Sequence, residues 1–258
     1  MGERVRARLL GCGTSSGVPR IGNDWGACDP SEPKNRRRRA SILIETASTR
    51  LLIDTSPDLR EQLLDADVVD VDAVIWTHDH ADHCHGIDDL RQLFHARNAP
   101  VAAYARPWTL TALAGRFAYA FEGKEGYPPI VTGHDLPDRL TIGDIAITCV
   151  DQPHGSITSV GFRFEHDGKS IGYATDFNEI TEKMRAAFRG LDLWVVDALR
   201  RRPHPTHPHL GQTLGWIDQL GVRRAVLTHM DQSMDYAGLI AELPAHIVPG
   251  HDGMVVEP

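Results

Sequence analysis

The chain of 258 residues is 41% hydrophobic and 24% charged, which are ordinary values for a globular protein. Its formal net charge of −8 argues against broad contact with nucleic acid, because phosphate backbones are bound by basic surfaces. The sequence contains no apolar run as long as a membrane span, and we expect neither a leader before Val5 nor a disulfide framework. We therefore expect a single compact domain over residues 1–258, cytoplasmic and without membrane contact.

Predicted strands and helices are interleaved along the chain, and the strands outnumber the helices. Apolar runs and alternating patterns predict the strands, and apolar residues at helical spacing predict the helices. Asp167-Gly168 is a type I′ hairpin signal between two strands. The expected strands are Val5–Leu9, Ser41–Glu45, Arg50–Asp54, Val74–Thr77, Ile145–Val150, Phe162–Glu165, Ser170–Ala174 and Ala225–Thr228. The expected helices are Pro57–Leu64, Gly86–Arg97, Thr109–Phe117, Ile180–Phe188, Thr213–Leu220 and Tyr236–Leu243.

Residues 117–134 are expected to form a loop. The segment contains Tyr119, Phe121 and Tyr127, and Pro128-Pro129 follows. A substrate lid, a dimer contact and ordinary packing all fit such a composition, and we favour the last two together.

The segment His78–His83, which reads HDHADH, is the densest group of candidate metal ligands. Three imidazoles and two carboxylates lie within six residues, between the predicted strand at 74–77 and the predicted helix at 86–97. A strand-to-helix turn points successive side chains in different directions, so His78 and His80 can serve one ion while Asp82 and His83 serve a second. Zinc and manganese both accept this mixture of ligands. Burial of such groups is costly unless they are paired or metal-bound.

Four further polar residues lie at or just beyond the ends of predicted strands. Asp54, His154, Asp176 and His229 follow apolar runs in this way. Asp176 has a second interpretation, because Thr175-Asp176 could cap the helix predicted at 180–188. Asp54 is equally well explained as a plain aspartate in a strand-to-turn connection.

The HDHADH segment resembles the HxHxDH signature of the metallo-β-lactamase superfamily, and the likeness runs along nearly the whole chain. The resemblance implies an α/β fold of the four-layer αββα type, in which two sheets pack face to face between layers of helices. It also implies two divalent metal ions, zinc or manganese. It places Asp54 behind a metal-bound histidine, which it would orient. The implied ligands are His78, His80 and His154 for one ion, Asp82, His83 and His229 for the other, and Asp176 for both.

Within the superfamily, the chain resembles the PhnP-like branch of phosphoribosyl cyclic phosphodiesterases and, more distantly, tRNase Z. The likeness rests on Gly11–Pro19, Asn35-Arg36-Arg37 and Asp252-Gly253-Met254. Ser15, Ser16 and Arg36 are the expected substrate-binding residues of these segments. Plainer interpretations stand beside these roles: a tight connection for the glycine-rich turn, and a solvated approach to the next strand for the arginines at 36–39.

The chain departs from the PhnP-like branch at a second, structural zinc site. Proteins of that branch often hold this zinc with cysteines after the glycine-rich turn and a histidine beyond the last catalytic ligand. Here the loop keeps only Cys28, and Gln232 stands where the histidine would fall. One thiolate and one amide do not make a tetrahedral zinc site, so we expect no structural zinc. Trp25 is expected to hold the loop by packing instead.

The segment 204–209 offers histidines that could act as the general acid for a leaving alkoxide. His207 is favoured because His207, Leu210 and Leu214 reproduce the H-x-x-L-x-x-x-L spacing of the family that the chain resembles. His209 is the alternative, as the acid or as a substrate-binding residue. A surface metal-binding tract is the plain interpretation of the segment.

The resemblance implies a phosphodiesterase in which a metal-bridging hydroxide attacks a small or cyclic, ribose- or nucleotide-like phosphodiester. Asp82 and His207 are the expected catalytic residues. Hydrolysis of carboxylic esters, lactones or thioesters on the same metal core is an alternative. A tRNase Z-like nuclease is another, although it needs a protruding basic arm and no lysine- and glycine-rich insertion is evident. A homodimer remains an open alternative to a monomer.

Overall fold

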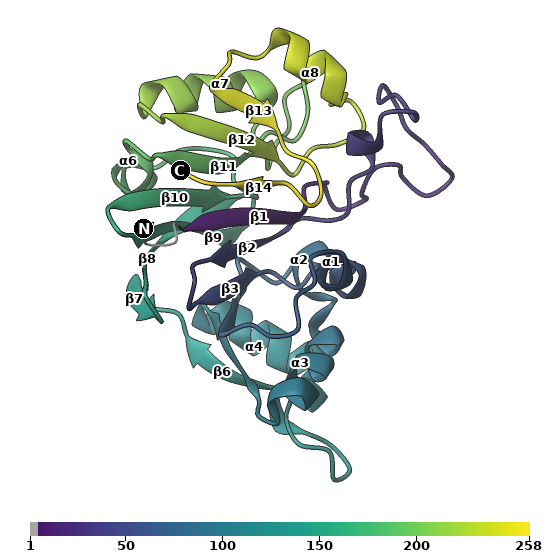
Figure 1. Ribbon diagram of the computed structural model, residues 1–258, viewed down its shortest axis with the longest axis vertical. Coiled ribbons are helices and arrows are strands. Elements are labelled where there is room, and N and C mark those ends of the chain that lie inside the picture. Colours follow the sequence, from purple (N-terminus) through teal and green to yellow (C-terminus); the bar gives the residue numbers. More distant parts are fainter. Residues whose placement is uncertain (1–4) are drawn as a thin grey trace.

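The computed structural model describes residues 5–258, which form two seven-stranded sheets with helices outside them (Figure 1). The first sheet has the order β14-β1-β2-β3-β4-β5-β6, and the second has the order β13-β12-β11-β10-β9-β8-β7. The strands of the first sheet are β1 (Arg6–Gly11), β2 (Ser41–Glu45), β3 (Arg50–Ile53), β4 (Ala73–Ile75), β5 (Val101–Ala105), β6 (Val131–Asp135) and β14 (Val255–Val256). Those of the second are β7 (Arg139–Ile142), β8 (Ile145–His154), β9 (Ile157–His166), β10 (Lys169–Ala174), β11 (Leu193–Asp197), β12 (Arg224–Thr228) and β13 (Ile247–Pro249).

The central strands of the first sheet bury both of their faces. Ile42 and Ile44 of β2 belong to the core shared with the second sheet, whereas Leu43 between them belongs to a separate core outside. Successive side chains of a strand point to opposite faces, so an apolar residue at every position requires cover on both sides. The second sheet covers one face and helices cover the other.

The helices lie on the two outer sides of the pair of sheets (Figure 1). Leu59, Leu90 and Leu113 pack into the outer core of the first sheet, and Met184 and Ile217 pack against the second. The four-layer αββα architecture expected from the sequence is confirmed. The helices are α1 (Leu59–Asp65), α2 (Ala81–Cys84), α3 (Leu90–Arg97), α4 (Pro107–Arg116), α5 (Ala118–Glu122), α6 (Glu182–Phe188), α7 (Leu210–Gln219) and α8 (Tyr236–Glu242), with 3-10 turns η1 (Pro33–Asn35) and η2 (Ile87–Asp89).

None of the helices formed by residues 5–258 combines the length and apolar character that crossing a membrane would need.

The expected loop at 117–134 contains ordered elements, so that prediction was wrong. Helix α5 and strand β6 occupy much of it, and Ala120 and Val131 are buried. Phe117, Tyr119 and Phe121 pack against the outer core of the first sheet. Packing of the short helix α5 against distant segments leaves no periodic pattern in so short a stretch of sequence. The helix was missed for this reason.

The strand directions bring several strand ends to one edge of the sandwich. Strands β10, β11, β12 and β13 are parallel to one another, and β3, β4 and β5 are parallel in the first sheet. Three residues just beyond strand ends, Asp54, Asp176 and His229, have left-handed backbones with φ of 65°, 58° and 56°. Asp and His tolerate this conformation better than most residues. At each of these three residues the chain turns sharply and leaves a polar side chain at the edge of the sandwich.

Candidate metal centre

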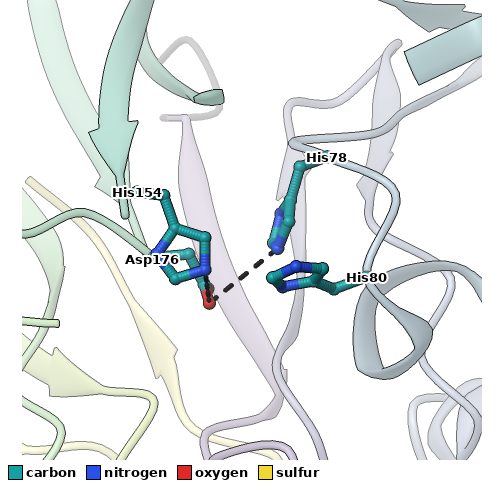
Figure 2. A group of neighbouring side chains, drawn as sticks. All are labelled: His78, His80, His154 and Asp176. Carbon is teal, nitrogen blue, oxygen red and sulfur yellow. Dashed lines mark ion pairs between the residues drawn. The ribbon is translucent and has the colours of Figure 1, made fainter. Parts of the chain in front are cut away.

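The side chains predicted to bind metal meet at this edge. One group contains His78, His80, His154 and Asp176, and its ligand atoms all lie within 4.8 Å of one another. A second contains Asp82, His83 and His229 under the same limit. Figure 2 shows His78 and His80 on one side of the first group and His154 with Asp176 on the other. The structure therefore brings together the two sets that the sequence assigned to two ions.

Asp176 lies between the two groups. Its Oδ1 is 3.9 Å from His78 Nε2 and 3.6 Å from His154 Nε2, whereas its Oδ2 is 3.1 Å from His83 Nε2 and 3.5 Å from His229 Nε2. Each carboxylate oxygen thus faces one group, which is the arrangement a bridging ligand requires. The alternative role of Asp176 as a helix cap is not found, because Thr181 caps α6 by accepting a hydrogen bond from Met184 N–H.

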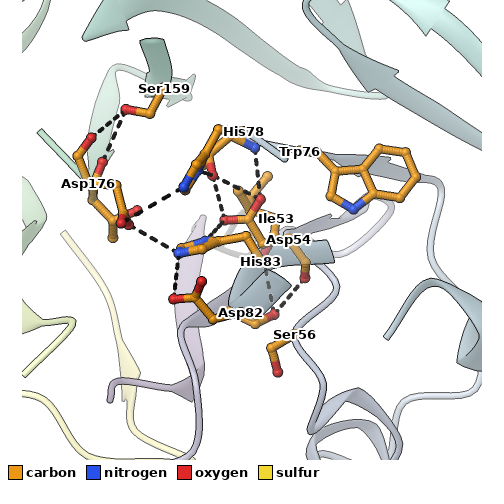
Figure 3. A network of polar contacts seen from close by, with 12 residues as sticks. Ile53, Asp54, Ser56, Trp76, His78, Asp82, His83, Ser159 and Asp176 are labelled. Carbon is orange, nitrogen blue, oxygen red and sulfur yellow. Dashed lines mark hydrogen bonds and ion pairs between the residues drawn. The ribbon is translucent and has the colours of Figure 1, made fainter. Parts of the chain in front are cut away.

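Three of the histidines are held from behind through Nδ1, which turns Nε2 toward the cluster. His83 Nδ1 lies 2.7 Å from Asp54 Oδ2, on the side of the ring away from Asp176 (Figure 3). Asp54 also accepts a 2.7 Å hydrogen bond from Thr77 N–H, and the Thr77 hydroxyl lies 2.9 Å from His78 Nδ1. His154 Nδ1 donates to the carbonyl of Thr206 at 2.9 Å. Such contacts fix the tautomer and orientation of metal-binding imidazoles.

The atoms at the centre of the cluster fit a divalent metal. His78 Nε2, His83 Nε2, His229 Nε2 and Asp176 Oδ2 are buried and have no hydrogen-bond partner among residues 5–258. Buried polar atoms without partners destabilise a fold by roughly 1–3 kcal/mol each. Imidazole nitrogens and carboxylate oxygens that converge in this way are the ligands that zinc and manganese accept. The cluster is therefore suited to metal binding.

Charge at the cluster favours a cation. Burial alone would lower the pKa of His229, but the carboxylates of Asp176 and Asp197 outweigh burial and raise it to about 9. Burial alone would raise the pKa of the Asp176 carboxyl, but the nearby charges of His229 and His83 hold it well below its usual range. A metal ion that binds here displaces imidazole protons, so its affinity falls as the pH is lowered.

Asp197 is the main residue of the site that sequence reasoning missed. It ends β11, is fully buried, and accepts a 3.0 Å hydrogen bond from the main-chain N–H of Asp176. The same oxygen, Oδ2, lies 3.0 Å from His207 Nδ1 and 3.7 Å from His229 Nδ1. Its position could have indicated a role in the site, because Asp197 ends an apolar strand and Asp54 and Asp176 likewise lie at strand ends.

The structure brings His207, and not His209, to the cluster. His207 Nε2 lies 3.8 Å from Asp176 Oδ1, and its ring stacks on that of His229 at 5.0 Å between centroids. His209 directly precedes α7, where its main-chain N–H donates to Gln212 Oε1 at 3.2 Å. His204 is placed beside His207 and accepts a hydrogen bond from Thr206 N–H at 3.3 Å.

A cavity of about 300 Å³ opens onto the cluster. Ser15 lines it, as expected, whereas the Ser16 hydroxyl donates to the carbonyl of Gly17 at 3.3 Å and does not line it. No arginine or lysine is among the lining residues, all of which belong to the described part of the chain. They are Ser15, His80, Asp82, His154, Ser156, Ile157, Asp176, Thr206, His207 and His229.

Arg36 is not brought to this cavity, contrary to its expected role in substrate binding. Its guanidinium lies 5.2 Å from the centre of the Trp25 ring, a cation–π contact that holds it on the outside of the molecule. Arg37 turns inward instead, where it is buried and donates to the carbonyls of Met234 at 2.6 Å and Asp231 at 3.3 Å. Arg37 thus fastens the segment after His229, and none of the four arginines lines the metal cavity.

The loop that carries Cys28 is joined to the same segment. Ala27 N–H donates to the carbonyl of Gln232 at 2.9 Å, and Arg37 Nη1 lies 3.8 Å from Cys28 Sγ. Trp25 contacts Arg36 and donates through Nε1 to Asn23 at 3.2 Å. The expected lack of a structural zinc stays a prediction.

The αββα fold and the histidine and aspartate cluster at its edge define a metal-dependent hydrolase. A family profile described as "Beta-lactamase superfamily domain" matches residues 49–230, so the chain belongs to the metallo-β-lactamase superfamily. The resemblance to this superfamily, noted from the HDHADH segment, is confirmed.

The chain is also similar to individual proteins. The chain is similar to an octanoyltransferase of Porphyromonas gingivalis, with 34% identity over 260 residues, covering 97% of this chain and 51% of that protein. It is also similar to ribonuclease Z of Methanopyrus kandleri, with 29% identity over 138 residues, covering 52% of this chain and 46% of the relative. The chain therefore spans about half the length of these two relatives.

A solved structure is similar over the whole chain. The crystal structure of a diphosphatase described as new in the PhnP family superimposes with a TM-score of 0.91 and 35% identity, covering 100% of this chain and 98% of that one. The expected likeness to the PhnP-like branch is thereby confirmed.

Proposed function

We propose that this protein hydrolyses a small phosphodiester with a cyclic, ribose- or nucleotide-like structure, and that two divalent metal ions serve the reaction. The observation that carries the proposal is the position of His207. This imidazole faces the cluster beside Asp176 and is backed by the Asp197 carboxylate. A proton donor held next to a metal site suits the departure of an alkoxide, which is a poor leaving group until it is protonated.

Two sets of residues would hold the metals. When bound, the ions would polarise a phosphoryl oxygen and lower the pKa of water enough to supply a nucleophile near neutral pH. Asp176 would contact both ions through its two oxygens. The two sets are His78, His80 and His154 for one ion, and Asp82, His83 and His229 for the other.

Asp82 and His207 would have different roles: Asp82 as a hydrogen-bond acceptor for water and His207 as the general acid. Burial alone would raise the pKa of the Asp82 carboxyl, but the charge of His83 and the nearby His229 imidazole, 3.6 Å away, hold it below its usual range. Asp82 therefore stays ionised and, from the cavity wall, orients the attacking water as a hydrogen-bond acceptor. His207 would donate its Nε2 proton to the leaving oxygen while its Nδ1–H stays hydrogen-bonded to the Asp197 carboxylate.

The cavity supports a small substrate. A volume of about 300 Å³ accommodates a sugar phosphate and not a folded nucleic acid. The hydroxyls of Ser15, Ser156 and Thr206 on its wall can bond to a phosphate or a sugar hydroxyl. Because the wall lacks arginine and lysine, the metal ions would have to balance the charge of the phosphodiester.

Two similar proteins support alternative substrates for the same metal centre. The similar structure described as a diphosphatase supports cleavage of a diphosphate ester at the same metal centre. The relative named octanoyltransferase supports an acyl substrate, such as an ester or a thioester. Direct assay distinguishes hydrolysis of a phosphorus–oxygen bond from hydrolysis of an acyl bond.

The test is metal analysis of the purified protein together with a panel of substrates. The panel contains a ribose cyclic phosphate, bis(4-nitrophenyl) phosphate, a diphosphate diester, a lactone and an octanoyl thioester. We expect two equivalents of metal and metal-dependent turnover of the phosphodiesters. Turnover of acyl substrates alone, or activity that survives complete chelation, would overturn the proposal. Turnover of the diphosphate diester alone would establish the second candidate in its place.

A further inference from the structure

A second cavity, of about 660 Å³, lies away from the metal centre, between helix α6 and strands β7 to β9. Its floor includes Thr148 of β8 and Arg163 of β9, which are paired across the two strands. Ala187 and Arg189, at the end of α6, form part of its wall. This cavity is more than twice as large as the one at the metal cluster, and we call it the basic groove.

The basic groove has a surplus of positive charge. Five cationic and three acidic side chains line it, in a chain whose net charge is −8. All three acids are paired with two of the arginines. Arg106, which is 7% exposed, bonds to Asp151 at 2.8 Å and to Asp138 at 2.7 Å, and Arg163 pairs with Glu165 at 3.0 Å.

Three cations of the groove remain without a counter-ion. Arg139, Lys183 and Arg189 make no ion pair with any residue between 5 and 258. They come from separate places in the fold, namely the start of β7, the first turn of α6 and the residue after α6. Unpaired cations that converge on one concave surface create a positive potential, which attracts anions.

The lining also indicates the kind of anion. Two of the unpaired groups are guanidinium groups, whose planar fork matches phosphate oxygens. No aromatic side chain is among the residues that line the groove, so a nucleotide base would find no ring on which to stack. A phosphorylated sugar or an inorganic polyphosphate fits this chemistry better than a nucleotide.

We propose that the basic groove is a second anion-binding site, which holds a phosphate-bearing small molecule apart from the metal centre. Asp151, the lining residue of β8 that is nearest to the metal ligand His154, precedes it by three residues, which corresponds to roughly 10 Å in a strand. The groove is therefore too distant to hold the reacting group of a substrate bound at the cluster.

Calorimetric titration of the metal-stripped protein tests the proposal, with inorganic pyrophosphate and ribose 5-phosphate as probes. We expect saturable binding of one equivalent of at least one probe. The double substitution Arg139→Gln and Lys183→Gln should weaken it by about tenfold or more, because each removes a charged hydrogen-bond donor. Both side chains are exposed, so the fold should persist; Arg189→Gln, outside the helix, provides an independent variant.

Two controls separate the groove from other sources of binding. The pair Arg60→Gln and Lys124→Gln removes the same charge from exposed positions outside the groove and should leave the affinity unchanged. His80→Ala alters the metal cluster and should also leave it unchanged. No saturable binding, an unchanged affinity in the Arg139 and Lys183 variant, or a loss of binding in His80→Ala would overturn the proposal. Binding of pyrophosphate alone would identify a polyphosphate site, and binding of ribose 5-phosphate would identify a sugar phosphate site.

Discussion

The carboxylate of Asp197 lies 3.0 Å from Nδ1 of His207, behind the imidazole that faces the metal cluster. The same oxygen accepts the N–H of Asp176, the residue placed between the two ligand groups. Asp197 is fully buried, and Thr213 fixes its main chain by donating to its carbonyl at 2.6 Å. One rigid side chain thus sets the positions of the candidate acid and of the candidate bridging ligand.

Asp197→Asn should keep the fold and lower the rate of hydrolysis. An amide can place its NH₂ group against His207 Nδ1, which favours the wrong tautomer and removes the charge that stabilises an imidazolium ion. We expect kcat to fall by about 10²–10⁴-fold, the usual range for the loss of general acid catalysis. Kinetics and metal analysis of the same samples check this. A variant with normal kcat would show that Asp197 has only a structural role.

His207→Ala should affect substrates according to their leaving groups. An alkoxide needs the proton of His207, whereas 4-nitrophenolate leaves readily without one. We expect the rate to fall by about 10²–10⁴-fold for a ribose cyclic phosphate and far less for bis(4-nitrophenyl) phosphate. His209→Ala, which changes a histidine outside the cavity, is the matched control and should behave as the wild type does. An equal fall for both substrates would argue against the acid role.

The positions of the candidate metal ligands were predictable because each depends on a local pattern. His78 to His83 form a compact segment, and His154, Asp176 and His229 each stand at the end of a strand, which apolar runs reveal. Asp197 has the same local pattern, but its role depends on the position of β11 between β10 and β12. A single sequence does not reveal that order of strands. The contact of His154 with Thr206 uses a main-chain carbonyl and leaves no side-chain signal at all.

Arg36, by contrast, was expected to bind the substrate but does not line the metal cavity. A run of four arginines near a glycine-rich turn suggests phosphate binding, but side chains in an extended segment alternate in direction. Arg37 is consequently buried among carbonyl groups and Arg36 packs on Trp25. The sequence therefore predicted which residues gather in the candidate metal cluster better than which residues line its cavity.

Helix boundaries differed for local reasons. Helix α7 begins at Leu210, three residues before the predicted start, and Gln212 accepts from the N–H of His209 at that end. The predicted helix at 86–97 instead opens with the 3-10 turn η2 before α3. Cap interactions of this kind shift the ends of an element without changing which residues face the core.

Asp54→Asn should weaken metal binding. Asp54 holds His83 through a 2.7 Å contact to Nδ1, and the loss of such a partner usually lowers metal affinity by about 10–100-fold. Asparagine accepts the left-handed backbone of this position, so the fold should persist. Competition with a chromophoric chelator measures the affinity, and excess metal should restore activity. Asp72→Asn, whose partner is Arg50 N–H, is the control, and equal affinities in the two variants would contradict the role of Asp54.

Glu45→Gln should destabilise the fold without affecting metal binding. The Glu45 carboxylate is buried and contacts Arg50 at 2.9 Å and Arg6 and Arg8 at 3.3 Å each. The glutamine NH₂ group would face arginine donors, so we expect a loss of about 2 kcal/mol in the free energy of unfolding. For a chain of this size that corresponds to a fall in Tm of about 4–8 °C.

The effect of Glu45→Gln should also depend on pH. Burial alone would raise the pKa of the Glu45 carboxyl, but the hydrogen bond from Arg50 and the charges of Arg6 and Arg8 outweigh it and leave the pKa below its ordinary value of 4.5. Stability that comes from a lowered pKa is fully present above the unfolded value and is lost as the pH falls through the folded one. The difference in Tm between wild type and variant should therefore be constant near neutral pH and shrink below about pH 4.5. Glu242→Gln, at an exposed pair with Arg201, should change Tm little at any pH, and a pH-independent difference for Glu45→Gln would contradict this assignment.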